Sequence, residues 1–378
     1  MFYILYERII PNTAPGNRFV SLLKGFDKLG VDGVAVLLQP SGNHYRIPND
    51  FGSIRIKYFW RDWPFITHLF DKIYGFFAYK RFKAKLKRGD IVFCFGSSKY
   101  VADLVQIRGI RVFHERTESP EVLPLRNSKK QKQYLKACNK LSGIFVISTA
   151  LKTFFVNNGM PIEKICIVNM TVDIQRFVSL KKSTTTEKYI AYCGTVSNNK
   201  DGVDDLIKAF ALVCQKYKDV KLYIIGASPS VNDESGNLKL INDLGITDKV
   251  VLTGVIEASK MPQLLLDSTI LALDRPDSLQ AKNGFPTKLG EYLMTGNPVV
   301  VTKVGDIPLF LKDGVSALLA EQRNTKEFAS KICWVLDHPT ESEAIGNKGK
   351  EVAMKEFNYQ TESKKIIDMI YGKDTYCG

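Results

Sequence analysis

The chain has 378 residues, of which 45% are apolar and 11% aromatic, a composition that excludes a disordered or fibrous protein. Its length predicts two domains. The net charge of +14 is uneven, because residues 1–178 hold 28 Lys and Arg against 13 Asp and Glu, while the remainder holds 25 against 26. This asymmetry indicates a polyanionic partner for the first half, either nucleic acid or an anionic membrane face, although a basic surface can also serve solubility alone.

The seven cysteines are scattered, with no C-x-x-C pair, and the chain has only four histidines. Zinc is therefore not expected, and thiols in apolar runs indicate a reducing cytoplasm. The first residues, MFYILYERIIPNT, lack the basic leader and cleavage site of a signal peptide. No run reaches eighteen apolar residues, so we expect a cytoplasmic protein without a membrane span.

Apolar strands alternate with helical segments along the chain, which is typical of parallel α/β sheets. In the first half, the predicted strands are 2–6, 33–38, 91–95, 111–114, 143–147 and 164–168. The predicted helices there are 19–29 and 101–108. The polar stretch 181–188 has no apolar side chain and is predicted to be the linker region between domains.

The same alternation restarts after this linker. Predicted strands are 189–193, 221–225, 249–253, 269–273 and 299–301, and predicted helices are 203–217, 260–267, 287–294 and 359–371. Asp233 and Glu234 are predicted to lie in a loop. The expected domains are 1–180 and 181–355, with 356–378 as a terminal helical segment.

The most informative stretch is NGFPTKLGEYLMTGNPVVVT, at residues 283–302. Pro286 suits the first turn of a helix, and Gly296 suits a position just after its end. A loop that leads into a helix start presents unpaired backbone N–H groups and so forms an anion site. Glu291 lies one turn beyond Lys288; the alternative is that these two residues form an ordinary solvated pair.

The segment FPTKLGEYLMTGNPVV resembles the donor-binding segment of retaining, nucleotide-sugar-dependent glycosyltransferases of family four, the group 1 glycosyltransferases. The resemblance implies the GT-B fold, with two Rossmann-like doubly wound α/β domains facing a central cleft and a C-terminal helix that crosses back to the first domain. It implies that Glu291 binds the ribose hydroxyls. Asn283 falls where the family has a Glu that contacts the transferred sugar, and an amide supplies hydrogen bonds there but no negative charge. The residues whose backbone would hold the donor phosphates are Phe285, Pro286, Thr287 and Lys288.

Two further donor segments carry the same resemblance. The loop CGTVSNNKDG places Lys200 where the family has a phosphate-binding Lys, and Thr195 where it often has an Arg. Lys288 or Arg275 is a candidate to replace that missing cation, while an exposed loop lysine is the alternative for Lys200. Gly254, in LTGVI, matches a turn whose backbone contacts the nucleotide base, or is an ordinary turn glycine.

In the first half, the resemblance is carried mainly by HERTESPEV, at residues 114–122. His114 is expected to end a strand and to lie beside the transferred sugar, and Glu118 to contact the acceptor or to act as a base. A packed strand-end residue is the alternative for His114. Glu115 is expected in the following loop, and Gly16, in PNTAPGNRF, resembles the family's glycine-rich loop near the donor phosphate.

Residues 58–88 combine eleven aromatic side chains with a basic cluster at their end. This pattern predicts an interfacial helix on an anionic bilayer, with Trp60 and Trp63 as anchors. The alternatives are an amphipathic helix packed in the first domain with a solvated basic end, or a surface for single-stranded nucleic acid, for which no RNA-module motif is present. The basic residues assigned to this surface are Lys80, Arg81 and Lys83.

The function implied is retaining transfer of a hexosyl group from a nucleoside-diphosphate sugar to a saccharide or lipid-linked saccharide, in the synthesis of a bacterial surface polymer. The chain has no Asp-x-Asp pair, so lysines and backbone amides are expected to replace a metal ion, and no cofactor is expected. We expect a peripheral protein on the inner face of the cell membrane. A Rossmann-type oxidoreductase needs a G-x-G-x-x-G after the first strand, which is missing. A catalytically silent protein that binds a nucleotide sugar or a polyanion is the other alternative.

Overall fold

The computed structural model describes residues 1–10, 13–39, 46–47, 51–59, 71–122, 128–184 and 187–372. The chain forms two compact units. The N-terminal unit comprises Met1–Thr171 and Tyr359–Gly378, and the C-terminal unit comprises Val172–Asn358. The chain thus leaves the first unit about ten residues before the predicted linker. Lys182 and Ser183, within that predicted linker, already bond to the C-terminal unit, with Lys182 Nζ 3.2 Å from Asn297 Oδ1.

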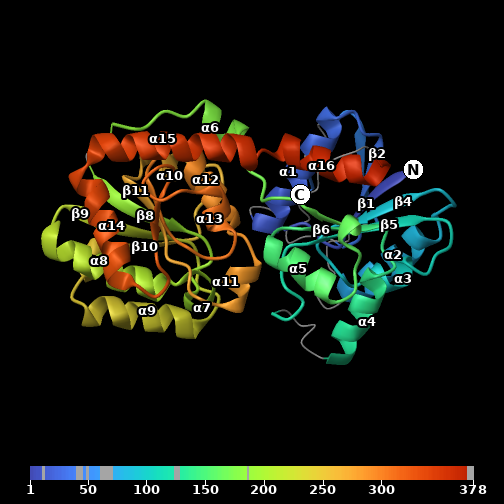
Figure 1. Ribbon diagram of the computed structural model, residues 1–378, viewed down its shortest axis with the longest axis horizontal. Helices are drawn as coiled ribbons and strands as arrows, with labels where there is room; N and C mark the ends of the chain where they lie inside the picture. Colours follow the sequence, from blue (N-terminus) through green and yellow to red (C-terminus); the bar gives the residue numbers. More distant parts are fainter. Residues whose placement is uncertain are drawn as a thin grey trace. The chain divides into compact units, whose positions relative to one another are not determined.

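The N-terminal unit contains a seven-stranded parallel sheet in the order β3-β2-β1-β4-β5-β6-β7 (Figure 1). The strands are β1 (Phe2–Tyr6), β2 (Gly33–Leu37), β3 (Ile54–Tyr58), β4 (Ile91–Cys94), β5 (Arg111–Arg116), β6 (Gly143–Val146) and β7 (Ile165–Ile167). The sequence analysis missed β3. This strand forms the edge of the sheet, and its Arg55 and Lys57 interrupt the apolar run that marks a strand buried on both faces.

Helices flank this sheet. They are α1 (Ala14–Lys28), α2 (Asp71–Lys83), α3 (Val101–Leu104), α4 (Ser128–Cys138), α5 (Thr149–Asn157) and α16 (Tyr359–Tyr371), with a short 3₁₀ turn at Ile162–Lys164. Helix α1 begins five residues earlier than predicted because Thr13 caps it. The Thr13 hydroxyl accepts from the backbone N–H of Gly16 at 3.3 Å, and Pro15 occupies the first turn.

The C-terminal helix α16 packs against α1, which confirms that this last helix belongs with the first domain. The two helices meet at Gly25, where a Cβ would overlap the side chain of Ser363. Below them, the core is rich in aromatic rings, including Phe19, Phe26 and Phe93, all with no exposed surface. Close helix packing at a glycine thus anchors the returning end of the chain.

The C-terminal unit contains a six-stranded parallel sheet in the order β10-β9-β8-β11-β12-β13. The strands are β8 (Lys188–Cys193), β9 (Val220–Ile225), β10 (Val250–Gly254), β11 (Ile270–Leu273), β12 (Val299–Thr302) and β13 (Leu318–Ala320). In both units the chain order reverses beside the first strand, between β1 and β4 and between β8 and β11. Ligands of such doubly wound sheets bind at the carboxyl ends of the strands at this point.

The helices of the C-terminal unit lie on the two faces of its sheet (Figure 1). They are α6 (Gln175–Val178), α7 (Asn198–Asp201), α8 (Val203–Lys216), α9 (Val231–Asp243), α10 (Met261–Asp267), α11 (Leu279–Asn283), α12 (Thr287–Thr295), α13 (Ile307–Phe310), α14 (Thr325–Asp337) and α15 (Pro339–Glu356), with a 3₁₀ turn at Thr247–Lys249. The prediction of a loop at Asp233 and Glu234 is wrong. Both lie in the first turn of α9, whose cap is Ser230.

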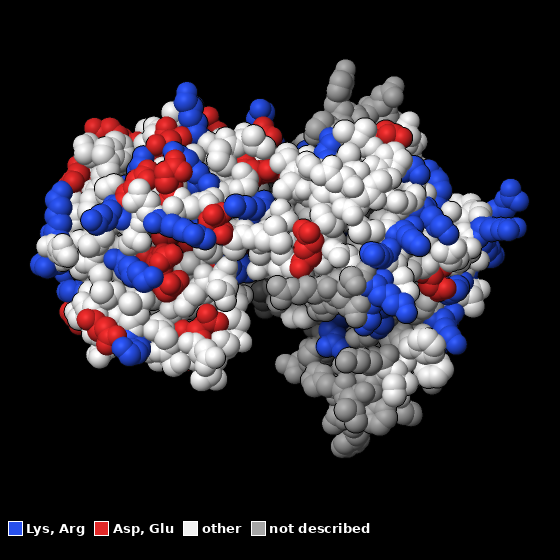
Figure 2. All heavy atoms as spheres, turned by 60° about the horizontal axis from the view of Figure 1, so that its bottom comes forward, with Lys and Arg blue, Asp and Glu red and all other residues white. Residues whose placement is uncertain are grey.

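The charge asymmetry of the sequence follows the division into units. The N-terminal unit has 30 Lys and Arg against 15 Asp and Glu, and the C-terminal unit has 23 against 24. On the face shown in Figure 2, blue side chains outnumber red ones over the N-terminal unit, whereas the two colours are mixed over the C-terminal unit. The described cysteines are free thiols, and four of the six are buried. No helix in the described ranges combines the length and the apolarity needed to cross a bilayer.

Candidate active site

The carboxylate of Glu291 lies on α12, in the middle of the helix predicted from the sequence. It forms an ion pair with Arg176, which α6 supplies from the start of the C-terminal unit. Arg176 also donates to the backbone oxygen of Ala258 at 3.4 Å. About a quarter of each charged side chain remains exposed. The alternative of a simple Glu291–Lys288 pair is therefore wrong, and the carboxylate is held in place while staying accessible.

Lys288 binds a different carboxylate. Its ammonium group forms an ion pair with Asp201 and donates to the hydroxyl of Tyr192 at 3.0 Å. Asp201 is buried, and it also accepts from the Tyr192 hydroxyl at 2.9 Å. Burial raises the pKa of Asp201, but Lys288 and Arg275 more than offset this, so its pKa is lowered and the carboxylate is ionised. Burial lowers the pKa of Lys288, and Asp201 acts against this as a fixed counter-ion.

The Lys288 ammonium lies directly over Gly194, the residue that follows β8. A Cβ at Gly194 would overlap the end of the lysine side chain, so only glycine permits this approach. The hydroxyl of Tyr292, one residue beyond Glu291, accepts from the backbone N–H of Cys193 at 2.6 Å. Tyr292 therefore fixes α12 against the carboxyl end of β8, which is the ligand-binding edge of the sheet.

The charged groups of Glu291, Lys288 and Arg176 all lie close enough to the Cys193 thiol to affect its pKa. Burial, and after it the charge of Glu291, raise the pKa of this thiol to about 12, against the lowering effect of Lys288 and Arg176. The structure thus brings Lys288 and Glu291 together at the end of β8. The sequence analysis named both of them but missed Arg176, Asp201 and Tyr192. Their partners are distant in sequence, although the acidic residue directly after Lys200 was a visible signal for Asp201.

The loop after β8 carries the other two predicted phosphate positions. Thr195 is exposed, and Lys200 is half-buried on the one-turn helix α7, directly before Asp201. Arg275 is buried, with Nε 3.9 Å from Asp201 Oδ1, so it adds a second cation to the buried carboxylate. Lys288 and Arg275, the two candidates for the missing cation, thus approach different carboxylate oxygens of Asp201, and their role in binding phosphate stays a prediction.

Asp274, which precedes Arg275, is a further buried carboxyl at the end of β11. Burial raises its pKa to about 8, with Asp205 and Asp204 acting in the same direction and Lys208 against them. The side chain is therefore largely protonated at neutral pH. The sequence offered no signal for this, because the pKa depends on which charges the fold places around the carboxyl.

The start of α12 follows the predicted arrangement of a loop that leads into a helix. Asn283 ends α11, Pro286 precedes the first turn, and Thr287 opens it, with no side chain capping the helix. Phe285 is buried among the rings of Phe310 and Phe357, at centroid distances of 5.5 and 5.4 Å. Its side chain serves packing. Gly254, at the end of β10, has a positive φ of 66° and open space around it, so its backbone is exposed at a turn.

His114 differs from the expectation. Strand β5 continues through Arg116, so the prediction that His114 ends a strand is wrong, and the imidazole is fully buried. Its Nδ1 lies 3.0 Å from the Cys94 carbonyl oxygen, which only accepts, so Nδ1 carries the hydrogen. Burial, together with Arg116, lowers the pKa to about 3. The ring is neutral, and its Nε2 has no hydrogen-bond partner among the described residues.

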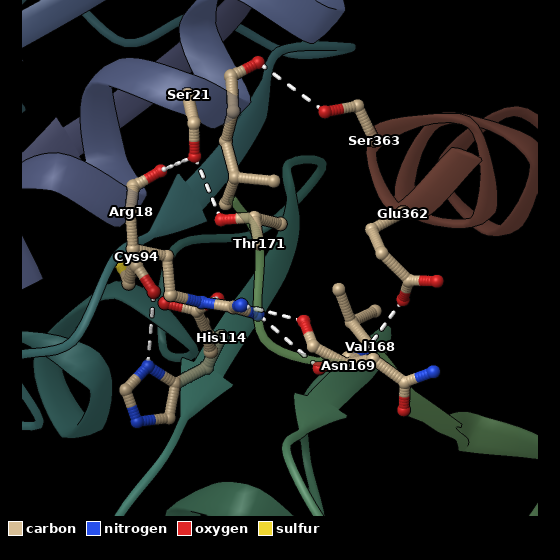
Figure 3. Close-up of polar contacts among 11 residues, drawn as sticks. Arg18, Ser21, Cys94, His114, Val168, Asn169, Thr171, Glu362 and Ser363 are labelled. Carbon is tan, nitrogen blue, oxygen red and sulfur yellow. Dashed lines mark hydrogen bonds and ion pairs between the residues drawn. The ribbon is translucent and has the colours of Figure 1, made fainter. Parts of the chain in front are cut away.

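Glu115 also differs from the expectation of a loop residue. It lies within β5, is buried, and pairs with Arg18 Nε at 2.8 Å. Figure 3 shows Arg18, from α1, pointing to the backbone of Val168 and Asn169, whose oxygens accept from it at 3.2 and 2.6 Å. Glu362, from α16, accepts from the Asn169 N–H at 2.6 Å. This enclosed network joins the segment where the chain leaves the N-terminal unit to the helix with which it returns.

The remaining predicted residues of the N-terminal unit lie apart from these networks. Gly16 is in the first turn of α1 rather than in a loop, because the helix starts early. Glu118 is half-buried, and its backbone oxygen accepts from Arg116 Nε at 2.7 Å. Trp60 and Trp63 lie outside the described residues. Lys80 and Arg81 are exposed on α2, whereas Lys83 bonds to Asp103 on α3 at 2.7 Å.

In the described ranges, no group of three or more His, Cys, Asp or Glu side chains has the arrangement needed to hold a metal ion. The charged groups at the end of β8 are instead organised as ion pairs, Lys288 with Asp201 and Glu291 with Arg176.

The known proteins that this chain resembles include glycosyltransferases. Residues 187–338 match the model of the family "Glycosyl transferases group 1". A poly(ribitol-phosphate) α-N-acetylglucosaminyltransferase of Staphylococcus aureus is 26% identical over 242 residues, 64% of this chain and 46% of that protein. An MMP α-(1→4)-mannosyltransferase of Mycolicibacterium hassiacum is 23% identical over 59% of this chain and 52% of its own length. The chain thus spans about half the length of these curated relatives.

Solved structures share the fold over most of the chain. Anabaena Alr3699/HepE in complex with UDP superposes with a TM-score of 0.76 over 98% of this chain and 99% of that chain, at 16% identity. S. aureus TarM, in complex with fondaparinux, α-GlcNAc-glycerol and UDP, covers 74% of this chain and 55% of its own, with a TM-score of 0.60 and 20% identity. Residues 187–338 thus match the glycosyl transferases group 1, and the chain has the α/β GT-B fold of two Rossmann-like domains.

Proposed function

We propose that this protein transfers a glycosyl group from a nucleoside-diphosphate sugar to an acceptor hydroxyl. The observation that carries the proposal is the pair of oriented charges at the end of β8. A lysine ammonium lies over Gly194, held by the buried Asp201, and the partly exposed carboxylate of Glu291 lies one turn along the same helix. A diphosphate needs positive charge and N–H donors, and a ribose needs a hydrogen-bond acceptor, so the two parts of such a donor have complementary partners here.

In the proposed reaction, the bond between the anomeric carbon of the sugar and the diphosphate oxygen breaks, and the anomeric carbon bonds to the acceptor oxygen. The acceptor proton leaves with the diphosphate. Negative charge develops on that leaving group, and we propose that Lys288, Lys200 and the N–H groups at the start of α12 stabilise it in place of a metal ion. Retention of the anomeric configuration is proposed from the family resemblance.

The other donor contacts follow from the same assignment. Glu291 accepts from the ribose hydroxyls, and Arg176 fixes its carboxylate so that little orientational freedom is lost on binding. Asn283 and His114 remain the proposed contacts to the transferred hexose. For His114 this requires that Nε2, enclosed in this structure, becomes the acceptor for a sugar hydroxyl.

The donor screen that tests this proposal is a thermal-shift measurement with UDP-, GDP-, ADP- and CMP-sugars. UDP-sugars come first, because the HepE structures are complexes with UDP and with UDP-glucose, and the TarM complex contains UDP. A ligand at about one hundred times its Kd adds roughly 2.7 kcal/mol of stability, which is a clear rise in Tm. Absence of a shift with all four classes of donor would contradict the assignment.

Variants at the proposed site test whether the donor that causes the thermal shift binds there. Glu291→Ala and Arg176→Ala should each reduce the shift, since the first removes the ribose acceptor and the second releases it. Lys348→Ala, on the exposed face of α15, is the matched control and should respond like the unchanged protein. If Glu291→Ala keeps the full shift, the donor is bound elsewhere.

For the acceptor, we propose a saccharide or lipid-linked saccharide used in the synthesis of a bacterial surface polymer, with the protein acting in the cytoplasm at the inner membrane face. The support is the +15 net charge of the N-terminal unit and relatives that act on poly(ribitol-phosphate) and on phosphatidylinositol mannosides. Nucleic acid is not the proposed partner. Radiolabelled transfer to membrane extracts, compared with extracts stripped of lipid-linked saccharides, tests this part of the proposal.

A catalytically silent binding protein is the second candidate. It is favoured by two departures from the family pattern, Asn283 in place of Glu and Thr195 in place of Arg. A silent protein gives the thermal shift but releases no nucleoside diphosphate. Measuring release of nucleoside diphosphate with the best-bound donor therefore separates the two.

A further inference from the structure

Helix α2 in the N-terminal unit has an outer face that its role in packing does not explain. Its inner side chains include Tyr79 and Phe82, which are 5% and 1% exposed and belong to the core. Its outer side chains include four large apolar residues, which is unusual for a helix surface in contact with water. These are Ile73 at 53%, Tyr74 at 39%, Phe76 at 48% and Phe77 at 58% exposed.

The apolar side chains occupy one continuous strip. Positions 73, 76, 77 and 80 are spaced by three and four residues and so lie on the same side of a helix, with 74 and 81 at its border. The rings of Phe76 and Phe77 are 5.7 Å apart, and Lys80 Nζ lies 4.6 Å from the centroid of the Phe76 ring. The strip therefore passes directly from aromatic to basic side chains.

The charges around the strip have one sign. Between Ile73 and Arg88 there are six Lys and Arg and no Asp or Glu. Lys83 forms an ion pair with Asp103, and Lys85 lies 5.1 Å from the Phe59 ring centroid. Lys80, Arg81, Lys87 and Arg88 are exposed and form no ion pair with a described residue. The helix thus offers uncompensated positive charge next to exposed rings.

We infer that the outer face of α2 docks the protein on an anionic lipid bilayer. The helix lies in the plane of the interface, with Ile73, Tyr74, Phe76 and Phe77 among the acyl chains and the basic residues at the anionic headgroups. Aromatic and aliphatic side chains beside Lys and Arg are the composition of helices that bind such an interface. The inference deepens the proposed function, because it identifies the element that brings the N-terminal unit to a membrane-bound acceptor.

The structure also sorts the two sequence-based expectations for this segment. Tyr79 and Phe82 are buried, as expected of a packed helix, and the interfacial prediction therefore applies only to the outer face of this 13-residue helix. The membrane assignment is therefore narrowed from a region of 31 residues to six side chains, those at 73, 74, 76, 77, 80 and 81.

The test is co-sedimentation of the full chain with vesicles of phosphatidylglycerol and phosphatidylcholine in equal parts, and with vesicles of phosphatidylcholine alone. The unchanged protein should sediment with the first and not with the second. Phe76→Ser with Phe77→Ser, and separately Lys80→Ser with Arg81→Ser, should each lower the partition coefficient about tenfold or more. All four residues are exposed, so far-UV circular dichroism and Tm should stay unchanged.

Matched controls come from the C-terminal unit. Val231→Ser with Leu238→Ser removes two apolar side chains from the exposed side of α9, where they are 78% and 50% exposed. Lys326→Ser with Lys355→Ser removes two exposed lysines from α14 and α15. Both controls should bind anionic vesicles like the unchanged protein.

Three results would overturn the inference. The first is equal binding to both kinds of vesicle, and the second is unchanged binding of the two α2 variants. The third is release of the protein from vesicles by single-stranded oligonucleotide that binds through the same α2 residues. The donor thermal shift is measured in parallel. Vesicle binding without a thermal shift would support the docking face but contradict the proposed transferase. A thermal shift without vesicle binding would contradict only the docking face.

Discussion

In the N-terminal unit, the ion pair between Arg18 and Glu115 is enclosed, with 4% and 2% of the two side chains exposed. In the C-terminal unit, the pair between Arg176 and Glu291 keeps 27% and 24% exposed. Both arginines also donate to backbone oxygens on segments distant in sequence, so the difference lies in exposure to solvent. Similar ion pairs thus serve two purposes, and the degree of burial distinguishes the one that holds the fold from the one available to bind.

A second contrast concerns two other buried titratable groups, His114 in the N-terminal unit and Asp274 in the C-terminal unit. His114 is neutral because burial and Arg116 disfavour the imidazolium, and Asp274 is neutral because burial and two nearby aspartates disfavour the carboxylate. Each group therefore makes its own unit sensitive to pH, in opposite directions. The following experiments separate these roles, starting with the largest expected effect.

Arg18→Ala should destabilise the N-terminal unit by about 3–5 kcal/mol, because it leaves Glu115 as an uncompensated buried charge. The measurement is urea unfolding followed by hydrogen exchange in peptides from α1 and from β5. Lys348→Ala, which breaks an exposed pair with Glu351, should cost less than about 1 kcal/mol. A loss below about 1 kcal/mol for Arg18→Ala would show that the enclosed pair does not hold the unit together.

Lys288→Ala should lower transfer by about 10²–10³-fold, equivalent to roughly 3–4 kcal/mol, since it removes a preorganised cation from the leaving diphosphate. Asp201→Asn should cost about tenfold, because the lysine stays but loses its counter-ion. Initial rates with the best-bound donor give both numbers. Lys303→Ala, at an exposed pair with Glu321, is the control and should keep its rate. If Lys288→Ala is as fast as the control, the diphosphate does not meet this lysine.

The pH dependence of stability should differ between the units. The pKa of His114 is lowered to about 3 in the folded state, so its contribution is present above its ordinary pKa of 6.5 and is lost as the pH falls toward 3. The pKa of Asp274 is raised to about 8, so its contribution is present below its ordinary pKa of 3.8 and is lost as the pH rises toward 8. Each contributes a slope of at most about 1.4 kcal/mol per pH unit.

The variants His114→Gln and Asp274→Asn remove these two slopes. Hydrogen exchange between pH 4 and 9, corrected for its intrinsic pH dependence, reports each unit separately. Acid should then destabilise the N-terminal unit less in His114→Gln, and base should destabilise the C-terminal unit less in Asp274→Asn. Slopes that stay unchanged in a variant would assign the pH dependence of that unit to other groups.

Prediction from the sequence worked best where the signal is local. The strand at Phe2–Tyr6 and the helix at Tyr359–Tyr371 have the predicted ends, because apolar runs and 3.6-residue periodicity are properties of neighbouring residues. It failed at β3, where an edge strand needs fewer apolar residues. It also failed at α9, whose first turn contains the polar residues Asp233 and Glu234 that were predicted to lie in a loop. It also started α1 too late, since the cap lies before the apolar periodicity begins.

At the candidate site, the sequence was sufficient to select Lys288 and Glu291, whose positions follow from one loop-and-helix motif. It gave no information on their partners, because Asp201 is 87 residues and Arg176 is 115 residues away along the chain. Folding alone brings these groups within reach and removes the water around Asp201. The exposure of the α2 rings depends on tertiary structure in the same way, since aromatic side chains of this one helix are buried at Tyr79 and Phe82 and exposed at Phe76 and Phe77.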